Sequence, residues 1–142
     1  MIDRELVTRK SLLIARDLEP LAELARIELP AFQASRSDQV LAERYLERII
    51  GRIIDINFHL ITAGGAAPPS DYYASFVELG RLGVLDPAFA QRLAPSAGLR
   101  NRLVHEYDGV DPVKLHKACR AATVDVPRYL RSVDTWLSDP GR

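Results

Sequence analysis

The sequence predicts an all-α fold, an antiparallel up-and-down bundle of helices with one short extra helix. Apolar residues recur at spacings of three, four and seven along most of the chain, which is the period of a helix with one buried face. Two Asp-Pro pairs, at 86–87 and 111–112, combine a capping carboxylate with a first-turn proline, which is typical of helix N-termini. No two alternating apolar runs flank a tight turn, so no hairpin is predicted.

Residues 3–28 form the first predicted helix, and its apolar residues fall on one broad stripe. Pro20 lies inside this pattern, where it either kinks the helix or begins a second helical segment. Pro30 and the polar stretch 35–37 then indicate a loop. The stripe consists of Leu6, Leu13, Ile14, Leu18, Leu21, Leu24 and Ile27.

Residues 37–62 form the second and strongest predicted helix, with Ser37 or Asp38 as its N-cap. Apolar residues leave little polar face in its second half, so we expect this helix either at the centre of the bundle or in an oligomer interface. The β-branched run 49–56 also fits a strand, but the length of the segment and the charges within it favour a helix.

Glycine and proline mark the end of the second helix and the bounds of a short third one. Gly64-Gly65, followed by two prolines, is a C-terminal signal and a stiff loop. Ser70 or Asp71 then caps a short helix that Gly80 and Gly83 close.

Two further helical segments complete the bundle. The Asp86-Pro87 pair opens a segment that Pro95 interrupts, and the helix resumes over about 96–107. The Asp111-Pro112 pair opens the last helix, which we expect to end near residue 137.

Size and composition indicate one domain over residues 1–142, with 47% hydrophobic residues for its core. The formal net charge is zero, which argues against a protein that coats nucleic acid through a broad basic field but is compatible with a local basic cleft. The single cysteine excludes an internal disulfide and fits a reducing cytoplasm. Neither a signal peptide nor an apolar run of about 18 residues is evident, so we expect a cytoplasmic protein without a membrane span.

The common catalytic motifs find no support in the sequence. His59, His105 and His116 lack the paired spacing of a helical metal site, and no cysteine supports one. No glycine-rich phosphate loop follows a strand, and no serine elbow is present. We therefore expect neither a metal nor a cofactor.

Polar side chains gather in residues 100–108, on the predicted helix that precedes the second Asp-Pro pair. At ~100° per residue, five of them share a little under half of the helix circumference, whereas Leu99 and Leu103 lie on the other side and face the core. Asn101 and His105 are four residues apart and can touch directly. The five are Arg100, Asn101, His105, Tyr107 and Asp108.

This set of residues suits chemistry on a phosphodiester. A histidine, with an ordinary pKa near ~6.5, can accept or donate a proton at neutral pH. An arginine presents a planar fork of donors that matches phosphate oxygens and offsets charge that develops during reaction. In RNA the 2′-hydroxyl lies beside the phosphorus, so one base can start an internal attack without a metal. The structural alternative is that Arg100 and His105 are ordinary surface or capping residues, favourable near the negative end of the helix dipole.

The pattern Arg100-x4-His105-x-Tyr107 resembles the Arg-x4-His-x-Tyr signature of the HepT-like branch of HEPN proteins. The resemblance extends, in order, over nearly the whole chain. It includes the helix that carries Arg9-Lys10, the segment 53–61, the Pro-Ser-Asp-Tyr-Tyr stretch and the turn at 79–85.

The resemblance implies a fold, an activity and a set of partners. HEPN domains are helical bundles that form homodimers, which bring two copies of the motif into one cleft. HepT-like members are metal-independent endoribonuclease toxins of type II/VII-like toxin–antitoxin modules, and they cleave RNA by attack of the 2′-hydroxyl. Carried over, Arg100 and His105 are the catalytic pair and Asn101 is their polar helper. The implied partner is an MNT-type nucleotidyltransferase antitoxin, which can attach AMP to Tyr107.

A second group of residues has two interpretations. Arg52, Asp55 and His59 form a polar stripe on the apolar second helix. In one interpretation the stripe lines the cleft, where Asp55 orients His59 or tunes His105, and Asp55, His59 and the locally basic Arg102 contact RNA. In the other, which we favour, the stripe is a buried, mutually satisfied network that fixes helix packing.

Four residues outside the stripe have simpler expectations. His116 is predicted on the surface of the last helix, and Cys119 as a small core residue. Tyr72 and Tyr73 either stack on bases or pack the short helix, and packing is the commoner role.

The rival to a nuclease is a non-catalytic HEPN domain that serves as scaffold or substrate-binding partner of a minimal nucleotidyltransferase. A third possibility is a plain structural bundle, in which Arg100 and His105 only cap a helix. Alanine variants separate these functions, because the nuclease loses activity and the plain bundle loses stability.

Overall fold

The computed structural model describes residues 1–106 and 108–139, and that part of the chain is helical without strands. The segment 49–56, for which a strand was the alternative, is helical throughout. The predicted all-α class is therefore confirmed. The helices are α1 (Arg4–Arg26), α2 (Leu29–Ala34), α3 (Arg36–Ala63), α4 (Tyr72–Arg81), α5 (Pro87–Leu93), α6 (Ser96–His105) and α7 (Pro112–Leu137).

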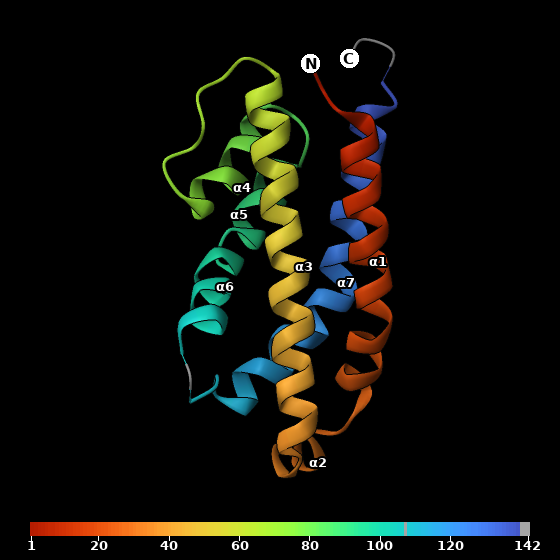
Figure 1. The fold of residues 1–142 in the computed structure, drawn as a ribbon, viewed down its shortest axis with the longest axis vertical. Coiled ribbons are helices and arrows are strands. Elements are labelled where there is room, and N and C mark those ends of the chain that lie inside the picture. Colours follow the sequence, from red (N-terminus) through yellow and green to blue (C-terminus); the bar gives the residue numbers. More distant parts are fainter. Residues whose placement is uncertain (107, 140–142) are drawn as a thin grey trace.

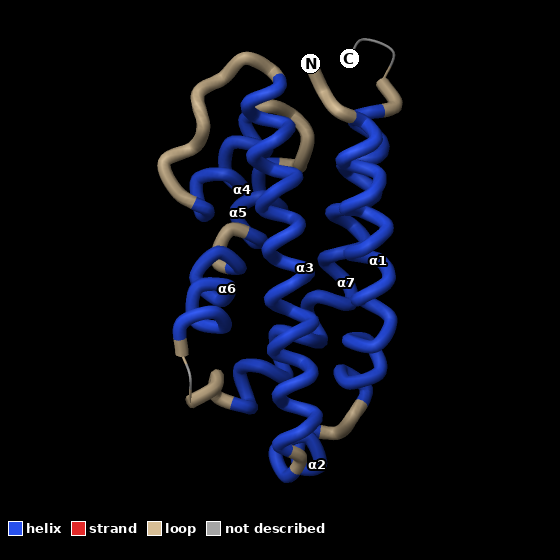
Figure 2. Tube along the Cα trace, in the orientation of Figure 1, coloured by secondary structure: helices blue, strands red, loops and turns tan. Residues whose placement is uncertain are grey.

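Three long helices run the length of the molecule, and α3 lies between the α1–α7 pair and the shorter helices (Figure 1). In Figure 1 the chain descends in α1 and ascends in α3, passes through α4 and α5 beside the upper half of α3, descends in α6 and ascends again in α7. Figure 2 shows that loops break the part of the chain between α3 and α7 into three short helices. The up-and-down order is as predicted, and the short helices α4, α5 and α6 together take the place of one long helix between α3 and α7.

The first two helices differ in detail from the prediction. Pro20 lies inside one continuous α1 and does not begin a second segment. A short helix, α2, replaces the loop expected around Pro30, because this proline lies in the first turn, where its missing N–H costs no hydrogen bond. The N-cap of α3 is Ser35, whose Oγ accepts from the amide of Asp38 at 3.3 Å, so the predicted caps Ser37 and Asp38 are wrong.

The aspartate caps are as predicted. Asp71 accepts from the amide of Ala74 at 2.7 Å and starts α4. Asp86 and Asp111 cap α5 and α7 in the same way, and a proline follows each of them. These capping residues therefore determine where α4, α5 and α7 begin.

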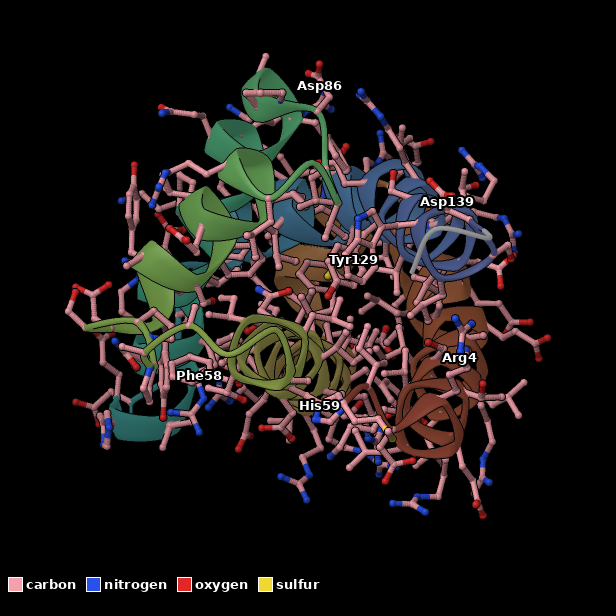
Figure 3. The ribbon with its side chains drawn as sticks, turned by 90° about the horizontal axis from the view of Figure 1, so that it is seen from above. Arg4, Phe58, His59, Asp86, Tyr129 and Asp139 are labelled. Carbon is pink, nitrogen blue, oxygen red and sulfur yellow. The ribbon has the colours of Figure 1, made fainter. Side chains whose placement is uncertain are left out.

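A buried polar chain joins α7, α3 and α4 through the centre of the bundle, where Figure 3 labels Tyr129. The Tyr129 hydroxyl donates to Asn57 Oδ1 at 2.6 Å, and Asn57 Nδ2 donates to Ser75 Oγ at 3.1 Å. Ser75 in turn donates to the carbonyl oxygen of Tyr72 at 2.7 Å. Burial raises the pKa of Tyr129 well above its ordinary value. This chain of hydrogen bonds fixes the first turn of α4 against α3.

The expectation for His116 was wrong, whereas that for Cys119 is confirmed. His116 is buried, with Nε2 2.7 Å from the carbonyl oxygen of Ile27 and its ring 5.2 Å from that of Phe32. It is buried because α2 packs against α7 and covers this part of it. Cys119 is fully buried, and burial raises the pKa of its thiol to about 12.

None of the helices in the described part of the chain is long and apolar enough to cross a membrane.

Candidate functional site

Arg100 lies on α6 at the edge of a cleft that three helices form. Its guanidinium carbon is 5.2 Å from the centre of the Tyr72 ring, which is the geometry of a cation–π contact. The cleft has a volume of about 260 Å³. Its walls are Gly51, Ile54, Asp55 and Phe58 from α3, Tyr72 from α4, and Arg100.

Tyr72 is positioned by two sets of contacts. The Asp71 cap and the hydrogen bond from Ser75 to the Tyr72 carbonyl fix its backbone. Its ring meets that of Phe58 edge-on, with centroids 6.0 Å apart and planes at 82°. Tyr72 is 36% exposed, so part of it remains open to solvent beneath the arginine. Figure 3 shows Phe58 on the side of α3 that faces α4 and α6.

His105 and Asn101 lie on the same helix as Arg100 but outside the cleft. Both are exposed, and among the described residues no hydrogen bond joins them. Ideal helix geometry separates Arg100 from His105 by ~7.5 Å along the axis and ~140° around it. A single chain therefore presents the two predicted catalytic side chains in different directions, the arginine toward the cleft and the histidine at the helix end.

The helix that carries the motif ends at His105, two residues before the predicted end at Tyr107. Glu106 is extended, with φ −95° and ψ 103°, and its amide donates to Arg102 O at 2.9 Å. Tyr107, the predicted site of AMP attachment, lies outside the described residues. Asp108 is exposed beyond the helix, so it does not share the helical face on which we placed it.

The segment that follows the motif returns to α3, where Glu43 holds it. The amide of Val110 donates to Glu43 Oε1 at 2.9 Å. The preceding Gly109 has φ +91°, and a Cβ there would lie 3.0 Å from Arg36 Nη1 and 3.2 Å from Glu43 Oε1. Nothing in the sequence pointed to Glu43, because only its distant partner distinguishes it from the other glutamate of α3. The glycine before the Asp-Pro pair was the available signal for a tight turn.

The polar stripe on α3 meets α1 and its N-terminus. Arg52 Nη1 donates to Asp17 Oδ2 at 2.7 Å, and Asp55 pairs with Lys10 at 2.9 Å. His59 Nε2 accepts from the amide of Asp3 at 2.8 Å, and Figure 3 shows His59 on the α1 side of α3. The stripe does join α3 to α1, but its members bond to α1 and its N-cap and none of them is buried, so the expected buried, mutual network is wrong.

Asp55 is the member of the stripe that the structure brings to Arg100, because it also lines the cleft. Arg102 lies elsewhere, on the wall of a second cavity of about 270 Å³ between α3, α6 and α7. Within the described residues, no group of three or more His, Cys, Asp or Glu side chains is placed to hold a metal ion.

Comparison with known proteins gives two sequence matches over most of the chain. The family model named Ribonuclease HepT-like matches residues 14–133. The tRNA nuclease HepT of Aphanizomenon flos-aquae (strain 2012/KM1/D3) is 38% identical over 125 residues, which cover 88% of this chain and 85% of that protein.

Solved structures match the fold. A Shewanella oneidensis HEPN toxin, tri-AMPylated and in complex with MNT antitoxin, superposes with a TM-score of 0.82 at 19% identity, covering 95% of this chain and 99% of that one. YutE from Bacillus subtilis, a cytosolic protein of unknown function, gives 0.84 at 16% identity, covering 99% and 95%. At these identities the similarity establishes the shared helical architecture.

Proposed function

The chain belongs to the HepT-like ribonuclease family, and from that premise we propose that it is a metal-independent endoribonuclease, the toxin of a toxin–antitoxin module. The observation that carries the proposal is the placement of Arg100. Its guanidinium lies at an open cleft against an aromatic ring, and no carboxylate among the described residues pairs with it. A cation left without a protein counter-ion at a cleft is suited to an anionic ligand such as a phosphodiester.

In the proposed reaction, neutral His105 takes the proton of the 2′-hydroxyl and that oxygen attacks the adjacent phosphorus. The bond from phosphorus to the 5′-oxygen breaks, this oxygen takes a proton from a water molecule and leaves as a hydroxyl, and protonated His105 returns its proton to the solvent. The products are a 2′,3′-cyclic phosphate end and a 5′-hydroxyl end. Arg100 binds the non-bridging oxygens and offsets the charge that grows on them. Asn101, beside Arg100 on the helix, is the polar helper.

We expect the active form to be a homodimer. In one chain Arg100 and His105 point in different directions, so a strand that follows the cleft needs a second motif to receive both groups at once. The exposure of His105 and Asn101 supports this arrangement, since both can meet a second copy or a bound strand.

The proposed partner is a nucleotidyltransferase antitoxin of the MNT type. The Shewanella oneidensis toxin with the same fold is tri-AMPylated and in complex with MNT antitoxin. In this chain Tyr107 follows His105 by two residues, and AMP on it would place a phosphate and a bulky base beside the motif. We infer that such a modification blocks the approach of RNA.

The test is cleavage of tRNA by the purified protein in EDTA, comparing the wild type with Arg100→Ala and His105→Ala. tRNA is the first substrate to try, because the Aphanizomenon flos-aquae relative is named as a tRNA nuclease. The matched control is Arg81→Ala, which removes an exposed arginine on another helix, paired only with Glu78 among the described residues. Cleavage that persists in both motif variants would rule out the assigned roles. Antitoxin binding without any cleavage by the wild type would instead indicate a non-catalytic scaffold.

A further inference from the structure

Gly51 lies in the middle of the 28-residue helix α3 and on the wall of the Arg100 cleft. Glycine is, after proline, the least favourable residue for a helix interior. The usual structural reason to retain it is a close neighbour that a side chain would strike. That reason is missing here, because a Cβ built on Gly51 meets nothing within 4 Å among the described residues.

The fold of one chain therefore does not require a glycine at this position. What the missing side chain provides is room, since a larger residue would project into the cleft. A glycine that leaves a helix backbone open beside a functional arginine is typical of a place where a ligand approaches closely.

Three kinds of chemical group line the open space beside Gly51. The Arg100 guanidinium offers donors for a phosphate. The rings of Tyr72 and Phe58 offer an apolar wall on which a base can stack. The Asp55 carboxylate, 56% exposed and already held by Lys10, can accept from a base amino group or a ribose hydroxyl. A cation, an aromatic wall and an acceptor together match the parts of one nucleotide.

We propose that Gly51 keeps open a subsite for one nucleotide of the RNA substrate, with its phosphate at Arg100 and its base against Tyr72. The proposal rests on the ribonuclease function and adds the place where the strand is held. The sequence offered Asp55 and Tyr72 as separate possible RNA contacts; the role of Gly51 and the joining of these groups into one subsite are new. A second copy of the chain is the other occupant that the space admits, and the experiment separates the two.

The experiment measures binding of a fluorescently labelled tRNA in the His105→Ala background, in which the RNA stays intact. Gly51→Ala and Gly51→Leu are added to this background. Both residues favour a helix more than glycine does, so the melting temperature should stay the same or rise. We expect Kd to weaken with side-chain size, by at least about tenfold for leucine, since this side chain occupies the space of the bound nucleotide. The matched control is Ala15→Leu at an exposed position on α1, which adds a leucine outside the cleft.

The outcomes separate this proposal from the ribonuclease function. If Gly51→Leu binds tRNA as tightly as its parent while the wild type cleaves, the subsite is wrong and the nuclease assignment stands. If the wild type neither binds nor cleaves RNA, both are wrong. If Gly51→Leu loses binding together with a change in molar mass by light scattering, the cleft is a contact between copies and the subsite is overturned.

Discussion

The polar side chains on the two sides of α3 differ in whether they have hydrogen-bond or ion-pair partners within the chain. On the α1 side, Asp17 receives Arg48 at 2.9 Å and Arg52 at 2.7 Å, and His59 accepts from the backbone of α1's cap. On the α6 side, Arg100 has an aromatic ring as its neighbour, and no hydrogen bond or ion pair joins it to another described residue.

The difference shows how to separate structural polar residues from functional ones in this fold. The seam between α1 and α3 satisfies its charges within the chain, so its cost of burial is already offset. On the motif helix, Arg100 is half-buried at an open cleft and His105 is exposed, and neither has a hydrogen bond or ion pair within the described residues. Residues of the first kind should act on stability when they are changed, and residues of the second kind on activity.

The largest expected effect is on the α6 side. Arg100→Ala and His105→Ala should each lower the rate of RNA cleavage by ~10²–10⁴-fold, the usual contribution of an acid–base group or a charge-stabilising donor. Their free energy of unfolding should change by less than about 0.5 kcal/mol, because exposed or unpaired side chains contribute little. Cleavage kinetics and urea unfolding on the same samples check both parts.

The distinction between the two faces is contradicted if the motif variants unfold more easily than the wild type and lose activity in proportion. In that case Arg100 and His105 stabilise the end of α6, as helix caps do, and the distinction between the two faces disappears.

The second prediction concerns the α1 side. Asp17→Ala removes a buried carboxylate that two arginines share, and we expect it to cost about 2 kcal/mol of stability. The cost is below that of a fully buried pair because the arginine side chains are 34% and 20% exposed. Urea unfolding measures it, and the cleavage rate well below the melting temperature should fall less than about twofold. A loss of cleavage without a loss of stability would place Asp17 in the site.

Local signals in the sequence predicted much of the fold, and non-local contacts account for its errors. Asp86 and Asp111 cap helices as expected, since each is followed by a proline that begins a helix well. The α2 helix was missed because six residues form a helix only where packing supports them, here by burial of Phe32. His116 was misplaced for the same reason, since its partner Ile27 is 89 residues away in the chain.

The site shows the same limit. Arg100, Asn101 and His105 lie on one helix as predicted, because spacing determines that much, whereas the helix ends at His105 and leaves Asp108 outside it. The contact of Arg100 with Tyr72 joins two helices and has no signature in either one. The helix stops at His105, and beyond it the amide of Val110 donates to Glu43, a residue on the second predicted helix and 67 residues away in the chain. The roles of Asn101, Arg102 and His59 remain predictions that only activity measurements test.

The third prediction concerns the pH dependence of stability that the buried Cys119 produces. The Cys119 thiol has its pKa raised from 9.0 to about 12, so the unfolded chain loses this proton before the folded one does. Stability from the thiol is therefore complete below pH 9 and falls between pH 9 and 12, by at most ~1.4 kcal/mol per pH unit. The buried Tyr129 phenol acts in the same direction above pH 10. Urea unfolding from pH 8 to 11 should show a smaller slope for Cys119→Ala than for the wild type, and equal slopes would contradict the assignment.

The smallest predicted effect tests whether the aromatic neighbour of Arg100 matters to the reaction. Tyr72→Leu removes the ring beneath the guanidinium, and we expect cleavage to fall about tenfold, the scale of one cation–π or stacking contact. Tyr72→Phe keeps the ring and should retain most of the cleavage rate. If the Tyr72 hydroxyl were the important group, this variant would lose the rate as Tyr72→Leu does. A fall in kcat at constant KM indicates that the ring positions Arg100, whereas a rise in KM indicates that it stacks on a base. If Tyr72→Leu cleaves as fast as the wild type, Arg100 needs no partner from α4, and the cleft beside the motif helix has no role in the reaction.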